Sequence, residues 1–342
     1  MIFAKGWRRW AGKSLSNAPA AVPPPPAAAL APAATPAVHY PLPTPDVELR
    51  QAEPVVRNVS SIAELDAVLK EVAAAHAVSD DAVRAALSSF RYVVDVANLP
   101  ADPYSIEYKK YQLELYERIA GRPYKIENER TSFLSGDAGA LPFPYYTQSW
   151  KTVSDHIVML GLIIRTLALP AKASILEFGP GWGNTSLALA QMGYQVTAVD
   201  IEQRFLDVIA HRCRDLATPP RLLCRDFAQV GELGERFDAI LFYESFHHSS
   251  DHQALLAGLP DLLKPEGKVL FAAEPIDDSL PMPWGLRLDG MSVWSTRCFG
   301  WLELGFTETY FREALKRAGF AVEKVRYPVT DLGTIFVARQ ES

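Results

Sequence analysis

Cysteine is scarce in this chain, with three residues in 342. Cys213, Cys224 and Cys298 are scattered, and no C-x-x-C pair is present. This number and spacing exclude a disulfide-rich scaffold and provide no zinc-binding motif. Free thiols are typical of proteins in a reducing compartment, so we expect the protein to be cytoplasmic.

Two further absences narrow the function. No apolar run reaches the roughly 20 residues that a membrane-spanning helix needs, and the best candidate, residues 157–169, contains Arg165. The net charge is −6, so the excess of positive charge that is typical of nucleic-acid-binding domains is missing. We therefore expect neither a membrane span nor a nucleic-acid partner, and the sequence makes no prediction of oligomeric state.

Acidic residues are missing from the first 45 positions, and from residue 17 this segment is rich in alanine and proline. Such a composition cannot build a core, so we predict a disordered Ala/Pro-rich tail over residues 1–50. Residues 1–15 combine bulky apolar side chains with four cations, which suits weak contact with the anionic inner face of a membrane. The alternative is a tail that makes no such contact. The apolar side chains are Ile2, Phe3, Trp7 and Trp10.

Helical patterns occupy the next region, residues 51–125. Ser61 followed by Glu64 predicts a capping box at the start of the first helix. We expect the region to be a helical appendage to the larger domain that follows it. The predicted helices cover residues 61–75, 80–90 and 105–119.

The most informative stretch is residues 174–203, where an apolar run leads into three closely spaced glycines, a helical segment and a second apolar run. Strand, glycine turn, helix and strand form the βαβ unit of a nucleotide-binding parallel sheet. Glycines let the backbone approach a ligand closely, and the start of the helix offers free N–H groups. The predicted segments are residues 174–178, 179–183, 184–192 and 195–199, followed by Asp200.

The spacing of polar residues around this turn distinguishes between ligands. A dinucleotide fingerprint has its third glycine at the sixth position, whereas here Gly183 comes early and Asn184 takes that place. Glu177 lies two residues before the first glycine, where a carboxylate would repel a pyrophosphate but suits a ligand with ammonium and sulfonium groups. Asp200 lies where an acid can accept hydrogen bonds from both hydroxyls of a ribose.

The sequences E-F-G-P-G-W-G and V-T-A-V-D-I-E resemble motif I and the ribose-binding motif of class I S-adenosylmethionine (SAM)-dependent methyltransferases. The resemblance implies SAM as the cofactor; a NAD site or a purely structural turn is the alternative. It also implies that Asp226 accepts a hydrogen bond from the adenine amino group, with Phe227 and Ile201 against the ring. The implied cofactor-binding residues are Glu177, Gly179, Gly181, Gly183, Asp200, Ile201, Asp226 and Phe227.

Beyond Asp200 strands and helices continue to alternate, and the resemblance covers residues 150–340. It implies an α/β fold: a Rossmann-like sheet of seven strands with helices on both faces, the last strand inserted antiparallel. We place the methyltransferase domain at residues 126–342, with a substrate-side insertion at about 275–306. The later strands are predicted at residues 221–224, 237–242, 268–273, 320–325 and 334–338.

A histidine-rich run, residues 243–252, follows the fourth strand, where the family brings its acceptor to the methyl group. A hydroxyl acceptor must lose its proton, and histidine is a suitable base. His247 and His248 are therefore the candidate catalytic residues, with polar packing as the alternative. The amine methyltransferases of the family often carry Asn/Asp-Pro-Pro-Tyr/Phe here, so this departure favours O-methylation. His248 and His252 are spaced for a shared helix face, but we expect no metal.

The acceptor is predicted from the aromatic segments. Tryptophans and charged groups in the insertion, among them Trp284 and Arg287, suit a hydroxylated ring such as a sugar. Tyr146 and Glu244 complete the candidate substrate residues. Short sequence segments of the insertion resemble those of bacterial methyltransferase domains found near glycosyltransferases of surface-polysaccharide pathways. This resemblance implies a glycan acceptor. The alternative acceptors are a natural product, a lipid or a quinone. The alternative from another class is a non-catalytic SAM-binding partner module.

Overall fold

The computed structural model describes residues 56–130 and 140–341. The tail predicted for residues 1–50, with its candidate membrane contact, lies outside the described residues. Residues 56–342 group into one compact unit. No helix of the described part has the length and apolar character that a membrane span requires.

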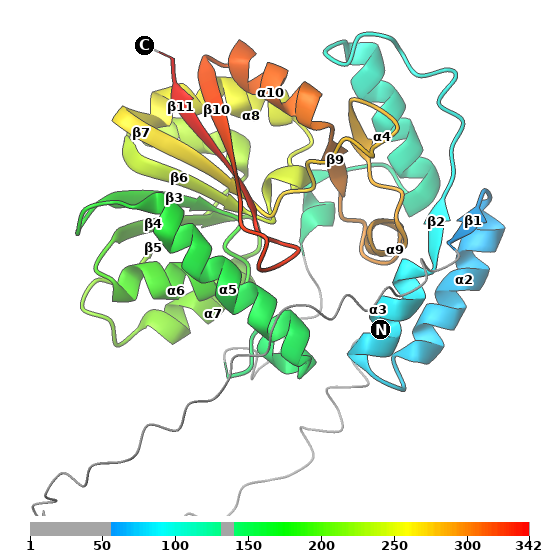
Figure 1. Cartoon of the computed structure of the whole chain (residues 1–342), viewed down its shortest axis with the longest axis horizontal. Helices are drawn as coiled ribbons and strands as arrows, with labels where there is room; N and C mark the ends of the chain where they lie inside the picture. Colours follow the sequence, from blue (N-terminus) through cyan, green and yellow to red (C-terminus); the bar gives the residue numbers. More distant parts are fainter. Residues whose placement is uncertain (1–55, 131–139, 342) are drawn as a thin grey trace, which may run out of the picture. The chain divides into compact units, whose positions relative to one another are not determined.

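A seven-stranded sheet forms the centre of this unit (Figure 1), and its strand order is β10-β11-β7-β6-β3-β4-β5. β11 runs antiparallel to both of its neighbours, while the pairs from β7 to β5 are parallel. This arrangement confirms the predicted Rossmann-like fold. The strands are β3 (Ser174–Phe178), β4 (Gln195–Asp200), β5 (Arg221–Cys224), β6 (Phe237–Tyr243), β7 (Leu263–Ala272), β10 (Phe320–Arg326) and β11 (Thr334–Gln340).

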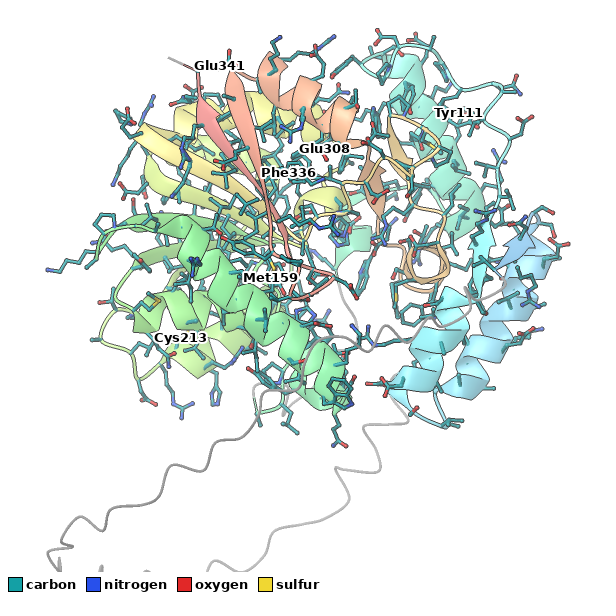
Figure 2. All side chains as sticks on the ribbon, viewed as in Figure 1. Tyr111, Met159, Cys213, Glu308, Phe336 and Glu341 are labelled. Carbon is teal, nitrogen blue, oxygen red and sulfur yellow. The ribbon has the colours of Figure 1, made fainter. Side chains whose placement is uncertain are left out.

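Helices cover both faces of the sheet because successive strand residues point to opposite sides. On one face Ile175 and Leu241 pack with Met159 of α5, which is labelled at that helix in Figure 2. On the other face Phe178 and Phe242 pack in the same cluster as side chains of α8 and α10. The helices are α5 (Trp150–Leu167), α6 (Asn184–Gln191), α7 (Gln203–Cys213), α8 (His252–Gly258) and α10 (Glu308–Arg317).

The region before the sheet contains the three predicted helices, α2 (Ile62–Ala75), α3 (Asp80–Ser88) and α4 (Ile106–Ala120). The Ser61–Glu64 capping box is confirmed, with both of its reciprocal hydrogen bonds present. Two strands of three residues, β1 (Arg57–Val59) and β2 (Phe90–Tyr92), pair in parallel beside these helices. The sequence did not predict them, because three residues are too few for a periodic pattern.

The insertion folds into β8 (Trp284–Leu286), α9 (Gly290–Cys298) and β9 (Leu304–Phe306), with β8 antiparallel to β9. It packs against the helical region through specific polar contacts. The Tyr108 hydroxyl donates to the Trp284 carbonyl at 2.7 Å, and Arg297 forms an ion pair with Asp66 at 3.0 Å. The helical region and the insertion therefore build one wall beside the carboxyl ends of the strands.

Short 3-10 helices connect these elements and contribute several of the polar side chains discussed below. They are η1 (Ile126–Glu129), η3 (Tyr145–Thr147), η4 (Phe227–Leu233), η5 (Phe246–His248) and η6 (Leu259–Leu262).

Candidate active site

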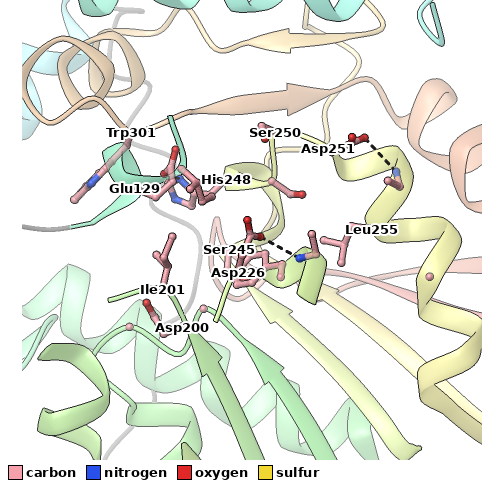
Figure 3. A pocket seen from close by; sticks show the side chains of 18 of the residues that line it. Glu129, Asp200, Ile201, Asp226, Ser245, His248, Ser250, Asp251, Leu255 and Trp301 are labelled. Atoms are coloured by element: carbon pink, nitrogen blue, oxygen red, sulfur yellow. Dashed lines mark hydrogen bonds and ion pairs between the residues drawn. The ribbon is translucent and has the colours of Figure 1, made fainter. Parts of the chain in front are cut away.

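A cavity of about 440 Å³ lies at the carboxyl ends of β3, β4, β5 and β6, the edge at which open α/β sheets bind ligands. Figure 3 shows its two sides: Asp200 and Ile201 approach from the strands, and Glu129 and His248 lie together opposite them. Polar and turn residues from widely separated parts of the chain thus face one space. They include Gly179, Gly181, Asp200, Asp226, Glu244 and His248.

The glycine turn borders this cavity, and its three glycines have different surroundings. All three have positive φ, a conformation that favours glycine. A Cβ atom on Gly179 would lie 2.6 Å from Ser245, and one on Gly183 would collide with Ile209. A Cβ atom on Gly181 would meet nothing within 4 Å, because this residue faces the open cavity. Gly179 and Gly183 thus allow close packing, and Gly181 leaves room for a ligand against the backbone.

Two buried acids flank the turn. Glu177 accepts a hydrogen bond from the Ser186 hydroxyl, and burial raises the pKa of its carboxyl to about 7. Asp200 accepts a hydrogen bond from the Glu202 backbone N–H at 2.8 Å, and burial raises its pKa to about 7 as well. Neither forms an ion pair with a side chain in the described segments. Their ionised forms therefore favour a ligand that brings positive charge or hydroxyl donors.

The residues expected around the adenine lie at the end of β5 and along the cavity. Asp226 caps η4 by accepting a hydrogen bond from the Ala228 N–H at 3.0 Å, so it has a structural role in this turn. It also lines the cavity, together with Ile201 and Phe227. The Phe227 ring packs edge-on against Phe178, with 5.0 Å between the centroids. An aliphatic and an aromatic side chain therefore both border the cavity.

His247 is held as part of the protein interior and does not line the cavity. Its Nδ1 lies 2.8 Å from Glu274 Oε2 and its Nε2 lies 3.5 Å from Glu303 Oε2. Burial alone would lower the pKa of the imidazole, but the two carboxylates outweigh burial and raise it to about 10. An imidazole that is protonated between two carboxylates and does not line the cavity cannot accept a proton from a substrate there. This geometry corrects the expectation that His247 is a candidate base.

His248 faces the cavity and lies beside an acid, Glu129, that was not predicted from the sequence. Its Nδ1 is 3.2 Å from Glu129 Oε2, which is buried, and burial raises the pKa of the Glu129 carboxyl. The backbone N–H of Leu302 donates to Glu129 at 3.0 Å. Glu129 belongs to a short 3-10 helix far from His248 in the chain, so no local motif signals the pair. His248 is the candidate base that the geometry retains.

Of the candidate substrate residues, only Glu244 lines the cavity. Glu244 has a positive φ of 50° after β6, and its side chain faces the cavity. Tyr146 instead packs against Trp182, with centroids 5.9 Å apart. Trp284 is buried and donates its indole N–H to the Pro103 carbonyl at 2.7 Å.

Arg287 pairs with Asp289 at 3.1 Å, and like Tyr146 and Trp284 it is absent from the cavity lining. The expected acceptor platform of Trp284 and Arg287 is therefore corrected: both serve the packing of the insertion. A different tryptophan of the insertion, Trp301, lines the cavity. His252, the partner considered for His248 in a metal pair, is buried, and its Nε2 lies 2.8 Å from the Tyr310 hydroxyl, which excludes that pair.

Comparison with known proteins identifies the central segment. Residues 175–267 match the family model described as "Methyltransferase domain". A ubiquinone biosynthesis O-methyltransferase of Coxiella burnetii is 31% identical over 115 residues, which cover 34% of this chain and 49% of that protein. An S-adenosyl-L-methionine-dependent Diels-Alderase of Talaromyces variabilis is 28% identical over 164 residues, or 45% and 56% of the two chains.

Among solved structures, the 1,6-didemethyltoxoflavin N1-methyltransferase of Burkholderia thailandensis has a TM-score of 0.42 and 21% identity, and the match covers 62% of this chain and 93% of that one. The chain spans about half the length of the curated relatives it matches. The matched segment contains the glycine turn, Asp200 and His248. This segment is therefore similar to methyltransferase domains, and the residues around the cavity fit SAM as a cofactor.

Proposed function

We propose that this protein is a SAM-dependent methyltransferase that transfers the methyl group to an acceptor hydroxyl. One observation carries the proposal: a single cavity contains the glycine turn and Asp200 on one side and His248 with Glu129 on the other. A cofactor held by the first group would present its methyl group toward the second. The two halves of the reaction would thus meet in one enclosed space.

The cofactor half is assigned by chemistry. The ionised Asp200 carboxylate accepts hydrogen bonds from both ribose hydroxyls, and Glu177 favours the positive charge of the methionine part. Asp226 accepts from the adenine amino group, while Ile201 and Phe227 lie against the ring. Gly179, Gly181 and Gly183 bring the backbone close to the cofactor.

The acceptor half requires an oxygen in line with the sulfonium methyl group. As the oxygen–carbon bond forms, the carbon–sulfur bond breaks, S-adenosylhomocysteine leaves, and the hydroxyl proton passes to His248. The Glu129 carboxylate, 3.2 Å from Nδ1, would stabilise the imidazolium that forms. General base catalysis of this kind contributes about 10²–10⁴-fold, and alignment of the two reactants contributes further.

The acceptor we propose is a small molecule with a free hydroxyl. A relative named as a ubiquinone biosynthesis O-methyltransferase supports this class, although it matches only part of the chain. A sugar of a surface glycan or of its precursor is the second candidate. The sequence resemblance of the insertion supports this candidate, and so does Trp301, whose indole lines the cavity and could stack on a sugar ring.

The alternative from another class is a SAM-binding module that does not catalyse methyl transfer.

We further propose that the protein is cytoplasmic. For the tail we propose that residues 1–15 make weak contact with the inner face of the membrane.

The test is transfer of isotopically labelled methyl groups from SAM to a panel of phenols, catechols, nucleotide sugars and lipid-linked glycans. We expect S-adenosylhomocysteine to form only when a hydroxylated acceptor is present, with the label on oxygen. Label on nitrogen would contradict the O-methyltransferase proposal. Tight SAM binding without turnover on any acceptor class would favour the non-catalytic module.

A further inference from the structure

Two histidines and a glutamate gather beside the cavity in an arrangement that the proposed reaction does not require. One potential ligand atom from each of His247, His248 and Glu303 lies within 4.8 Å of the others. The separation between His247 Nε2 and Glu303 Oε2 is 3.5 Å. Two ligands at about 2.1 Å from a tetrahedral zinc ion are separated by about 3.4 Å, so this pair has the spacing that a metal needs.

From this geometry we propose that His247, His248 and Glu303 form a binding site for a divalent transition-metal ion. Imidazole nitrogen and carboxylate oxygen are donors that suit zinc, cobalt, iron and nickel. Three protein ligands leave a coordination position for water or for a substrate oxygen, as in catalytic rather than structural zinc sites.

The surroundings of the two histidines provide a second observation. The Nδ1 atom of His247 is hydrogen-bonded to the buried Glu274 carboxylate at 2.8 Å. The Nδ1 atom of His248 lies 3.2 Å from the buried Glu129 carboxylate without the geometry of a hydrogen bond. In metal sites the ligating histidine characteristically donates its other N–H to a carboxylate, which fixes the tautomer and leaves the remaining nitrogen for the metal. Glu274 is itself fixed by the backbone N–H groups of Ser245 and Phe246, at 2.8 and 2.9 Å.

The charges around the cluster also favour a cation. Glu129, Glu274 and Glu303 are all buried carboxylates, with at most 10% of each side chain exposed. Burying several carboxylates is costly unless positive charge compensates them. Arg287 is paired with Asp289 at 3.1 Å and approaches Glu303 only at 3.9 Å. A divalent ion would compensate the carboxylates more fully than one protonated imidazole.

The site borders the cavity through His248 and Glu129, so its role rests on the proposed function. A metal ion at this position would take the acceptor oxygen into its open coordination position and lower the pKa of the hydroxyl. With a metal bound, His248 would be its ligand, and the hydroxyl proton would pass to solvent instead of to His248. His248 is needed for turnover in either form.

Metal binding can be measured without turnover. Untagged full-length protein is stripped with a chelator, titrated with Co²⁺, and examined by visible absorption and by elemental analysis after gel filtration. We expect roughly one ion per chain and the absorption of a low-coordinate cobalt site with nitrogen and oxygen ligands. His247→Ala and the nearly isosteric Glu303→Gln should lose the spectrum and most of the bound metal. His211→Ala, which changes an exposed histidine of α7, should retain both.

SAM titration of the same preparations separates the two proposals. Variants that bind SAM like the unmodified protein but take up no cobalt would support the metal site, because the fold and the cofactor site are then intact. Unmodified protein that binds SAM without taking up cobalt, or a cobalt spectrum that survives Glu303→Gln and His247→Ala, would overturn it. His247 would then be a protonated imidazole that forms ion pairs with Glu274 and Glu303. If the unmodified protein does not bind SAM, the proposed function itself is contradicted.

Discussion

Asp200 ends β4 with a buried carboxylate, and its pKa of about 7 lies well above the ordinary aspartate value because of that burial. In the free protein the folded state therefore holds this proton up to about pH 7, whereas the unfolded chain releases it near pH 4. The stability that this group contributes is present below about pH 4 and is lost as the pH rises to about 7. In the proposed cofactor site SAM would reverse the preference, because its ribose hydroxyls favour the ionised carboxylate.

We expect SAM affinity to fall as the pH decreases below about 7, approaching tenfold per pH unit if Asp200 alone controls binding. Calorimetric titrations at about pH 6 and about pH 8 would measure this. Glu177→Gln is the matched control, since burial gives Glu177 a pKa in the same range. If affinity is equal at both pH values, the ionised Asp200 carboxylate has no role in binding.

His248 supports a second expectation at the scale of one residue. His248→Ala should lower turnover about 100-fold or more, because it removes the proton acceptor or metal ligand, and should leave SAM affinity unchanged. Initial rates and calorimetry on the same preparation test both parts. His211→Ala, on the exposed side of α7, should behave like the unmodified protein. An undiminished rate in His248→Ala would remove this residue from the catalytic site.

At the scale of elements, the sequence predicted the strands at the cofactor side closely. Glycines and the change from apolar strands to a helical segment mark the limits of β3 and β4, and the structure has them at Ser174–Phe178 and Gln195–Asp200. The three-residue strands β1, β2, β8 and β9 were missed, because tertiary packing rather than a local pattern defines them. The carboxylates beside His247 and His248 were missed for a related reason: Glu129, Glu274 and Glu303 meet the histidines only in the folded chain.

Trp284 shows the same limit of prediction from sequence. Trp284 was expected at the acceptor because indole and charged groups occur together in the insertion. Composition cannot tell an indole that faces a cavity from one that packs in the core, and Trp284 does the latter.

The contact between the insertion and the helical region gives a prediction on stability. Gly290 begins α9, and a Cβ atom there would collide with the Leu87 carbonyl and lie 2.8 Å from the Phe90 ring. We expect Gly290→Ala to lower the free energy of unfolding by about 1–3 kcal/mol. Gly161 lies on the exposed face of α5 with nothing within 4 Å of an added Cβ, so Gly161→Ala should stabilise by about 0.5–1 kcal/mol. Urea unfolding measures both; equal midpoints would contradict the packing of α9 on α3 and β2.

For the whole molecule, the described structure assembles the candidate active site from three regions. Glu129 follows the helical region, His248 follows a central strand, and Trp301 comes from the insertion. The segment that follows the helical region thus forms part of the cavity wall, together with the insertion and the ends of the central strands. This assembly explains why the site could not be read from the segment that matches the methyltransferase family alone.

The tail is the subject of a separate expectation that rests on its sequence. Full-length protein should bind anionic vesicles weakly and lose binding as salt rises, because cations and apolar side chains in residues 1–15 act together. Co-sedimentation with anionic and neutral vesicles would measure this, with a variant that lacks residues 1–15 as the control. Equal sedimentation of the two proteins would assign the tail the role of a spacer.

Calorimetric titration of the full-length protein with SAM and, separately, with NAD tests the central claim most directly. We predict micromolar SAM binding, no NAD binding, and loss of SAM binding by about 100-fold or more in Asp200→Ala, since two hydrogen bonds to a charged group are removed. Asp207→Ala, which changes an exposed acid of α7, should bind SAM normally. Binding of NAD, or SAM binding that persists in Asp200→Ala, would contradict the assignment of the glycine turn and Asp200 to a methyl-donor site.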